Sequence, residues 1–472
     1  MDSSRNSDRV LGSAGPRERG RIAVVLPYWD FWETAVPWDF RADRESLLAE
    51  AVAIAGRFSS VAVAAVLPNE QAAIALQSEV RDLDAIVIVS TMAVPSATTM
   101  ALLAEAEHVP ILVWALSQTP RLADGFSHTD ITTAGSPVGT PMITSALARA
   151  QRRFDVVATS TEAPEAAVTA IRRVVAAGRI ARGPILVVGK PIAGYSTVSP
   201  PAESDFPINY VALPVKEFAE AAHTSNDDQV RLRVAEIREQ FDVQSTVTDL
   251  AIRRAAQAEV ALRQIVQHAG AVAGTINCHE AALRGNPEFG IAPCLALGRL
   301  TTEGIPFTCT GDVLTALAML TVQSLGYPTL YHEIEAIDFE NDEVVLANSG
   351  EHDLGLCPNR ADLIPNNWYA HDAIVGPCAL YSIPAGPASL VAFVMAPQPR
   401  FVVAQGSFTG HEFPQTGVPN AGFRFNGRHV AQAWADWARS GVTHHSAATN
   451  VHLADDIRAI ANLLDAEFVQ VS

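Results

Sequence analysis

The feature that most limits the fold of this chain is a regular alternation of short apolar segments and longer amphipathic segments near its start. Four apolar segments have the length and composition of buried strands: residues 21–26, 61–66, 85–89 and 111–114. Helix-length segments, such as residues 44–57, separate them. Strands that alternate with helices of this length predict a parallel, doubly wound sheet with a flavodoxin-like order of units. No GxGxxG motif follows the first strand, so a dinucleotide is not indicated.

The pattern restarts twice further along the chain, which indicates three domains. A second α/β series begins near residue 156, and a β-rich character dominates after about residue 358. Residues 1–20 are polar and are expected to be a disordered leader. We therefore predict three domains: a flavodoxin-like α/β domain, a central α/β domain and an antiparallel, barrel-like β-rich domain, at residues 21–155, 156–326 and 327–472.

Composition excludes several classes of partner. The formal net charge of −18 argues against nucleic acid or an anionic membrane surface, because both are bound through Lys and Arg. A neutral polar small molecule fits this charge better. The five cysteines are odd in number and form no CxxC motif, which indicates free thiols in a reducing compartment. No signal peptide or membrane span stands out, so we expect a cytoplasmic protein.

Polar side chains that could take part in catalysis or metal binding gather at the ends of predicted elements in residues 306–358. Thr310-Gly311-Asp312 follows a short strand and opens a helix, and Asp312 is most simply the N-cap of that helix. A direct chemical role for Asp312 is the alternative. Strand ends beside loops are where catalytic and metal-binding groups tend to lie.

A carboxylate and imidazoles occupy comparable positions after this helix. Glu333 ends an apolar segment, His352 follows the predicted strand 343–347, and His444-His445 lies in a loop near the C-terminus. Each residue taken alone fits a surface or loop position. Together, Glu333, His352 and His445 form a set of ligands that suits a divalent metal of the manganese, iron or zinc kind.

Three segments then resemble one family, the L-arabinose isomerase and L-fucose isomerase superfamily. They are ALGRLTTEGIPFTCTGD, GEHDLGLCP and WARSGVTHHSAATN, at residues 296–312, 350–358 and 437–450. The resemblance implies two α/β domains followed by a β-rich domain, assembled as a homotrimer or homohexamer. It also implies an intramolecular oxidoreductase that uses Mn²⁺, or another divalent metal, to interconvert an unphosphorylated aldose and its ketose through a cis-enediol.

The resemblance assigns expected roles to the residues of this chain that match the functional residues of the family. Glu333 matches a metal-binding carboxylate that also moves protons, so it is expected to be the main acid/base. His352 and His445 match metal-binding histidines. His444 is expected to line the substrate pocket.

The chain departs from the family at Thr310, where the family normally has a glutamate that binds metal and carries protons. Thr310 and Asp312 remain expected contributors to the site. Glu280 is an expected substrate contact, and it is one of the acids, with Glu335, that could supply the second proton carrier. Trp38 belongs to a tryptophan-rich loop of core or interface aromatics, and the alternative is that it binds the substrate by stacking on the sugar.

Two other functions stay open at this point. The same scaffold could carry altered chemistry on a sugar-like substrate, as an epimerase, lyase or dehydratase. Alternatively, the chain could be a non-catalytic sugar-binding protein, because a fold does not determine a function.

Overall fold

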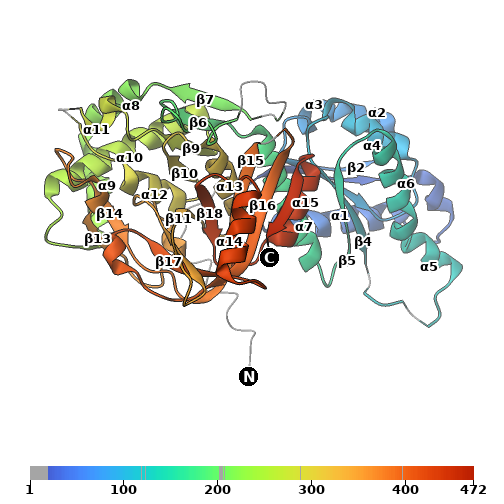
Figure 1. Ribbon diagram of the computed structural model, residues 1–472. Coiled ribbons are helices and arrows are strands. Elements are labelled where there is room, and N and C mark those ends of the chain that lie inside the picture. Colours follow the sequence, from blue (N-terminus) through green and yellow to red (C-terminus); the bar gives the residue numbers. More distant parts are fainter. Residues whose placement is uncertain are drawn as a thin grey trace. The chain divides into compact units, whose positions relative to one another are not determined.

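The computed structural model describes residues 20–471, apart from residues 119, 123, 201–205, 207, 287–288 and 396. Its architecture is α/β with a β-rich C-terminal part, as predicted (Figure 1). The contacts divide the described chain into two compact units. The first extends to Arg182 and includes Ala459–Asp465, and the second runs from Gly183 to Arg458 and resumes at Ala466.

The first unit is a doubly wound sheet of five parallel strands in the order β2-β1-β3-β4-β5. The strands are β1 (Arg21–Pro27), β2 (Ser60–Leu67), β3 (Ala85–Ser90), β4 (Ile111–Ser117) and β5 (Phe154–Ser160). The order is that of flavodoxin-like domains, which confirms the prediction. The three central strands β1, β3 and β4 are almost continuously buried, as expected for a sheet covered on both faces.

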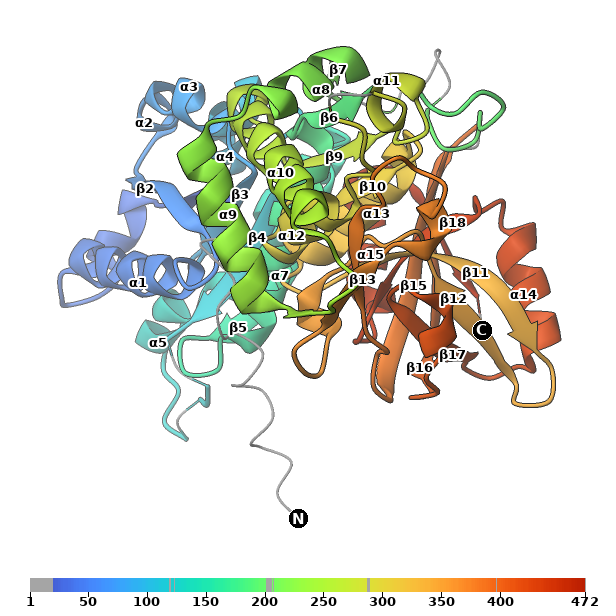
Figure 2. The same cartoon turned by 90° about the vertical axis from the view of Figure 1, so that its left-hand side faces the viewer.

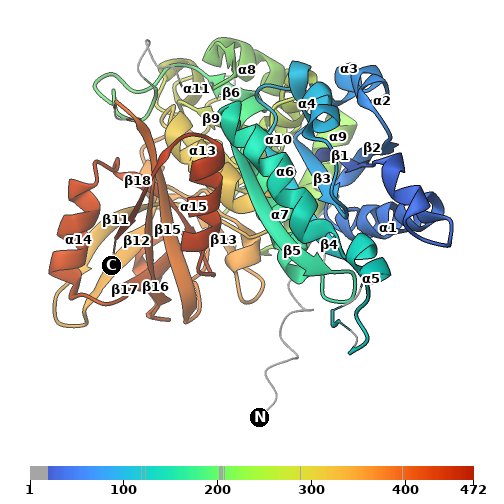
Figure 3. The same cartoon turned by 90° about the vertical axis from the view of Figure 1, so that its right-hand side faces the viewer.

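Helices cover both faces of this sheet. They are α1 (Phe40–Ala55), α2 (Glu70–Ala75), α3 (Gln77–Val80), α4 (Ser96–Leu102), α5 (His128–Thr133), α6 (Ser136–Arg149) and α7 (Glu165–Arg182). Helix α1 contacts α7, whereas α4 contacts α6, and Figure 3 shows α6 and α7 beside the strands. Because β5 and α7 belong to this unit, it continues to Arg182, whereas the sequence analysis placed a boundary at residue 155.

The second unit begins with a smaller parallel sheet in the order β10-β9-β6-β7. Its strands are β6 (Ile185–Val188), β7 (Tyr210–Leu213), β9 (Ala273–Ile276) and β10 (Phe307–Cys309). The helices are α8 (Val215–His223), α9 (Asp227–Gln240), α10 (Asp249–Ala269), α11 (Ala281–Arg284), α12 (Cys294–Thr302) and α13 (Val313–Ser324). Helix α10 packs against α8, α9 and α12, and Figure 2 shows α9 and α10 side by side.

The C-terminal part of this unit is a seven-stranded sheet in the order β15-β18-β11-β12-β17-β16-β19. Its strands are β11 (Leu330–Asp338), β12 (Glu343–Ala347), β15 (Gly386–Met395), β16 (Pro399–Phe408), β17 (Asn420–Phe425), β18 (His445–Thr449) and β19 (Glu467–Val471). An additional pairing of β15 with β16 closes the antiparallel strands on themselves, which confirms the barrel-like prediction. A small separate sheet joins β14, β13 and β8 at Pro377–Leu380, Asp362–Pro365 and Asp242–Val243.

One hydrophobic core serves both the helices and the barrel of the second unit. It includes Ile237 and Phe241 near the end of α9, Ile252 of α10, and Leu346 and Leu390 of the barrel strands. The helical and β-rich parts therefore share buried apolar area instead of forming separate cores. Among the described residues, none of the helices combines the length and the apolar character needed to cross a membrane. All five cysteines are free thiols.

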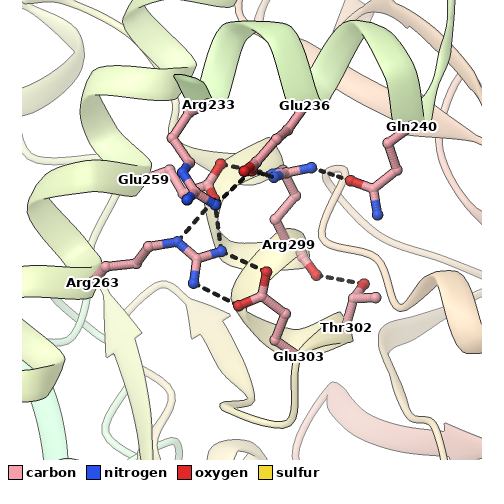
Figure 4. A network of polar contacts seen from close by, with 9 residues as sticks. Arg233, Glu236, Gln240, Glu259, Arg263, Arg299, Thr302 and Glu303 are labelled. Atoms are coloured by element: carbon pink, nitrogen blue, oxygen red, sulfur yellow. Dashed lines mark hydrogen bonds and ion pairs between the residues drawn. The ribbon is translucent and has the colours of Figure 1, made fainter. Parts of the chain in front are cut away.

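A balanced network of ion pairs, centred on the buried Glu259 and Arg299, joins α9, α10 and α12 (Figure 4). The fully buried Glu259 carboxylate accepts hydrogen bonds from Arg299 and Arg263, each at 2.7 Å, and Arg233 lies 3.9 Å away. Arg299 also contacts Glu236 at 3.1 Å and Gln240, and Arg263 forms a forked pair with Glu303. Three arginines thus share three glutamates, so the charge withdrawn from water is compensated within the network.

We predict that Glu259→Gln destabilises the protein strongly, because it leaves the buried Arg299 guanidinium group without its buried counter-charge. The free energy of unfolding should fall by about 3–5 kcal/mol, measured by urea denaturation. The matched control is Glu220→Gln on α8, which breaks a solvent-exposed pair with Lys216 and should change stability by less than about 1 kcal/mol. Equal effects of the two substitutions would contradict a structural role for this network.

Candidate functional site

The sequence-predicted acid Glu333 and the His444-His445 pair meet where β11 lies beside β18. Glu333 and His445 are directly opposed in the antiparallel register of these strands. Glu333 Oε1 lies 2.8 Å from His445 Nε2 and 3.9 Å from His444 Nε2. One ligand atom from each of the three residues lies within 4.8 Å of the others. Within the described part of the chain, this is the one such group of acidic, histidine or cysteine side chains that could hold a metal ion.

Asp312 approaches the other side of the His445 ring. Its Oδ2 lies 2.7 Å from His445 Nδ1, and both side chains are almost completely buried. Asp312 is also the N-cap of α13, because its Oδ1 accepts a hydrogen bond from the Thr315 N–H at 2.8 Å. The predicted cap is therefore confirmed, and the same carboxylate reaches the site.

The electrostatics of His445 follow from these two carboxylates. Burial disfavours the charged imidazolium, but hydrogen bonds to Asp312 and Glu333 outweigh it and raise the pKa of His445 to about 9. Burial also acts to raise the pKa of Glu333, but its hydrogen bond and charge interaction with His445 lower that pKa overall. The ring is therefore held between two negative groups.

A second carboxyl group stands beside Glu333. The register of β11 against β12 shifts between Ile334 and Ala336, so Glu335 lies in a β-bulge. Its side chain is solvent-exposed, and partial desolvation together with the nearby Glu333 carboxylate raises the pKa of Glu335 to about 7. The two carboxyl groups thus differ in proton affinity, as in many acid/base pairs.

Two tyrosines complete the surroundings of the histidines. The Tyr331 hydroxyl lies 2.8 Å from His445 Nδ1, and the Tyr195 ring meets the His444 ring nearly at right angles, with centroids 4.9 Å apart. Sequence reasoning missed both. Tyr331 could have been found, because it is two residues before Glu333 on a strand and therefore shares its face. Tyr195 lies in a loop, where no periodicity points to it.

Thr310 lies in the turn between β10 and α13. It has a left-handed backbone conformation, with φ of 61°, and its side chain is largely buried. The hydroxyl oxygen has no hydrogen-bond partner. Thr310 lies two residues before Asp312 in the chain and supplies no carboxylate.

His352, predicted as a metal ligand, is not a member of the group formed by Glu333, His444 and His445. Its ring packs against the Phe241 ring and over Gly298, where an added Cβ would lie 2.1 Å from Nδ1. Neither ring nitrogen has a hydrogen-bond partner. Burial, aided by the nearby Arg299 charge, lowers the pKa of His352 to about 3.

The side chain of the preceding residue, Glu351, points away from His352 and toward Ser349 and Cys309, near the end of β10. Its Oε2 accepts a hydrogen bond from the Ser349 hydroxyl at 3.0 Å, and the Ser349 oxygen lies 3.6 Å from Cys309 Sγ. Burial and the nearby Cys278 thiol raise the pKa of Glu351 to about 7. In the loop after β12, the Glu351 carboxyl group thus lies toward Cys309, and the His352 imidazole lies toward Phe241 and Gly298.

The remaining predicted residues lie outside the group. Glu280 precedes α11 and accepts a hydrogen bond from the Lys190 N–H at 3.1 Å. Trp38 belongs to the first unit, immediately before the Asp39 cap of α1, and is 43% exposed.

Comparison with known proteins agrees with the motifs. No curated protein matches the chain. The family model of the L-arabinose isomerase central domain matches residues 198–327, which include α8 to α13 and the turn that carries Thr310 and Asp312. This match supports a sugar isomerase in general. Through this central domain, the match supports the resemblance of the chain to the L-arabinose isomerase and L-fucose isomerase superfamily.

Proposed function

We propose that this protein is a metal-dependent aldose–ketose isomerase that acts on an unphosphorylated sugar, with Glu333 as its main acid/base. The observation that carries the proposal is the group of Glu333, His444 and His445 in a chain with an arabinose isomerase central domain. We further propose a homotrimer or homohexamer, as the resemblance implies, and a cytoplasmic location, as the free cysteines indicate.

The residues present fit a divalent cation. Two imidazoles and one carboxylate suit Mn²⁺, Fe²⁺ or Zn²⁺. Asp312 stands behind His445 as the carboxylate that commonly orients a metal-binding histidine. When bound, such a cation stabilises negative charge on the sugar oxygens during the reaction. Glu333, His445 and His444 are therefore the proposed ligands, with Mn²⁺ as the proposed native metal.

In this proposal, the carboxyl groups of Glu333 and Glu335 transfer the proton. Moving a carbonyl group from C1 to C2 through a cis-enediol requires removal of a proton from one carbon and its return to the neighbouring carbon. The lowered pKa of Glu333 keeps it ionised and able to accept a proton, and Glu335 is partly protonated near neutral pH. We propose that Glu335 provides the second proton-carrying group, since position 310 has a threonine.

The same threonine favours one alternative. A site without the usual acid at Thr310 could carry out epimerisation, dehydration or carbon–carbon cleavage on a related substrate. A panel of aldoses and ketoses, with product analysis by NMR, distinguishes these reactions from isomerisation and from binding without turnover.

We predict that activity depends on both carboxyl groups. With Mn²⁺ and the best substrate of the panel, Glu333→Gln should lower kcat by at least about 100-fold, as expected for loss of a general acid/base. Glu335→Gln should lower kcat while leaving metal affinity intact. The control is Glu340→Gln at the exposed turn after β11, which should retain full activity. An isomerase unaffected by Glu333→Gln would contradict the assignment.

We predict that metal binding distinguishes His445 from His352. In calorimetric titration of the metal-stripped protein with Mn²⁺, His445→Leu should abolish binding. His352→Leu should retain it and should not lower thermal stability, because neither nitrogen of His352 has a partner to lose. Loss of binding in His352→Leu, with the fold intact, would restore His352 as a ligand.

We predict a specific pH dependence for the metal-free protein. The pKa of His445 is about 9 in the folded state, above the value of about 6.5 expected when unfolded. Its stabilising effect should therefore be complete below pH ~6.5 and should be lost as the pH rises through about 9. The thermal midpoint of the wild type should exceed that of His445→Gln at pH 6, and the difference should shrink toward pH 10. A constant difference would contradict this pKa.

A further inference from the structure

We infer that Tyr331 is a positioning residue for His445. Its hydroxyl group, together with Asp312, holds Nδ1 of the imidazole and leaves Nε2 facing Glu333. The inference rests on the proposed function in one respect, namely that Nε2 of His445 binds the metal. The hydrogen bonds of Tyr331 and Asp312 to His445 are present in the metal-free protein and do not depend on that assumption.

Strand pairing brings these side chains together. In the register of β11 against β18, Glu333 faces His445 and Tyr331 faces Ala447. Tyr331 and Glu333 are two residues apart and therefore share one face of the strand, where Tyr331 is a diagonal neighbour of His445. His332 points to the opposite face, where its Nε2 lies 3.0 Å from the Ser446 hydroxyl. The alternation of β11 thus places a tyrosine and a glutamate on either side of one imidazole.

The hydrogen bonds show that Nδ1 carries a proton in both the charged and the neutral imidazole. An ionised carboxylate can only accept, so Nδ1 must donate to Asp312 Oδ2 at 2.7 Å. The Tyr331 oxygen, 2.8 Å from the same nitrogen, is a second acceptor for that N–H group. Nδ1 is therefore engaged by two groups from two different elements. Nε2, 2.8 Å from Glu333, donates to that carboxylate while the imidazole is charged, and it is the nitrogen that can bind a cation once this proton is released.

Tyr331 is itself held from its far side. The side chain is 1% exposed, and its ring lies against the His445 ring with centroids 4.6 Å apart. The Cys309 thiol at the end of β10 points to the Tyr331 hydroxyl at 4.0 Å and contacts Ser349 after β12. The hydroxyl group is thus fixed by neighbouring strand ends, which restricts rotation of the imidazole.

The test removes the hydroxyl group and keeps the aromatic ring. The full-length Tyr331→Phe variant is stripped of metal and titrated with Mn²⁺ by calorimetry, and with Co²⁺ by visible absorption. Loss of a partner that orients a metal-binding histidine typically weakens metal affinity by about 10–100-fold. We expect at least a tenfold loss for Mn²⁺ and a changed Co²⁺ spectrum, with a cooperative thermal transition that shows an intact fold.

The matched control is Tyr28→Phe in the first unit. Tyr28 is also buried, and its hydroxyl donates to Glu33 Oε1 at 2.8 Å, so the same chemical group is lost away from the site. Tyr28→Phe should leave Mn²⁺ affinity and the Co²⁺ spectrum unchanged. A merely structural effect of removing a buried hydroxyl would change both variants alike and would overturn the inference.

Two further outcomes separate this inference from the proposed function. If Tyr331→Phe binds Mn²⁺ like the wild type while His445→Leu loses binding, the role of Tyr331 is overturned and the proposed metal site stands. If the unaltered protein binds neither Mn²⁺ nor Co²⁺, the proposed metal site and the role of Tyr331 are both overturned.

Discussion

The contact on which the site depends is the imidazole of His445 held between the carboxylates of Asp312 and Glu333. The three residues come from the α13 cap, β11 and β18, and Asp312 and His445 are 133 residues apart in the chain. A carboxylate buried as completely as Asp312 requires a partner of opposite charge or several hydrogen-bond donors. His445 supplies the opposite charge and the N-terminal turn of α13 supplies hydrogen-bond donors. The contact that arranges the site therefore also stabilises the buried Asp312 carboxylate.

Asp312 links the chemistry to helix packing. Helix α13 is almost entirely buried between the parallel sheet and the barrel strands, so its N-terminus has little access to water. A cap at that end is needed to satisfy its backbone N–H groups. Asp312 provides this cap with one oxygen and meets His445 with the other. A substitution at Asp312 therefore changes helix stability and the orientation of His445 together.

The parts of the structure that were predictable are those with local periodicity. Both parallel sheets follow from apolar strands alternating with helices, and Asp312 and His445 lie at the start of a helix and of a strand, whereas Glu333, which the sequence analysis placed at the end of an apolar segment, lies inside β11. The loop after β12 has no periodicity. Gly350 has a φ of 121° there, and the chain turns so that Glu351 instead of His352 lies toward Cys309. Sequence spacing alone could not decide between two adjacent residues in an irregular segment.

The β-bulge in β11 bears on how the site could work with a threonine at position 310. In a regular strand, residues 333 and 335 share a face, but their Cβ atoms are about 7 Å apart, given the rise per residue. The bulge increases local twist and changes side-chain direction, and the Glu335 carboxyl group lies near the Glu333 carboxylate. A second acid thus reaches the site from the strand that carries the first. The threonine at position 310 removes one of the two acids that the family normally has. The β-bulge in β11 can provide a second acid, Glu335, beside Glu333.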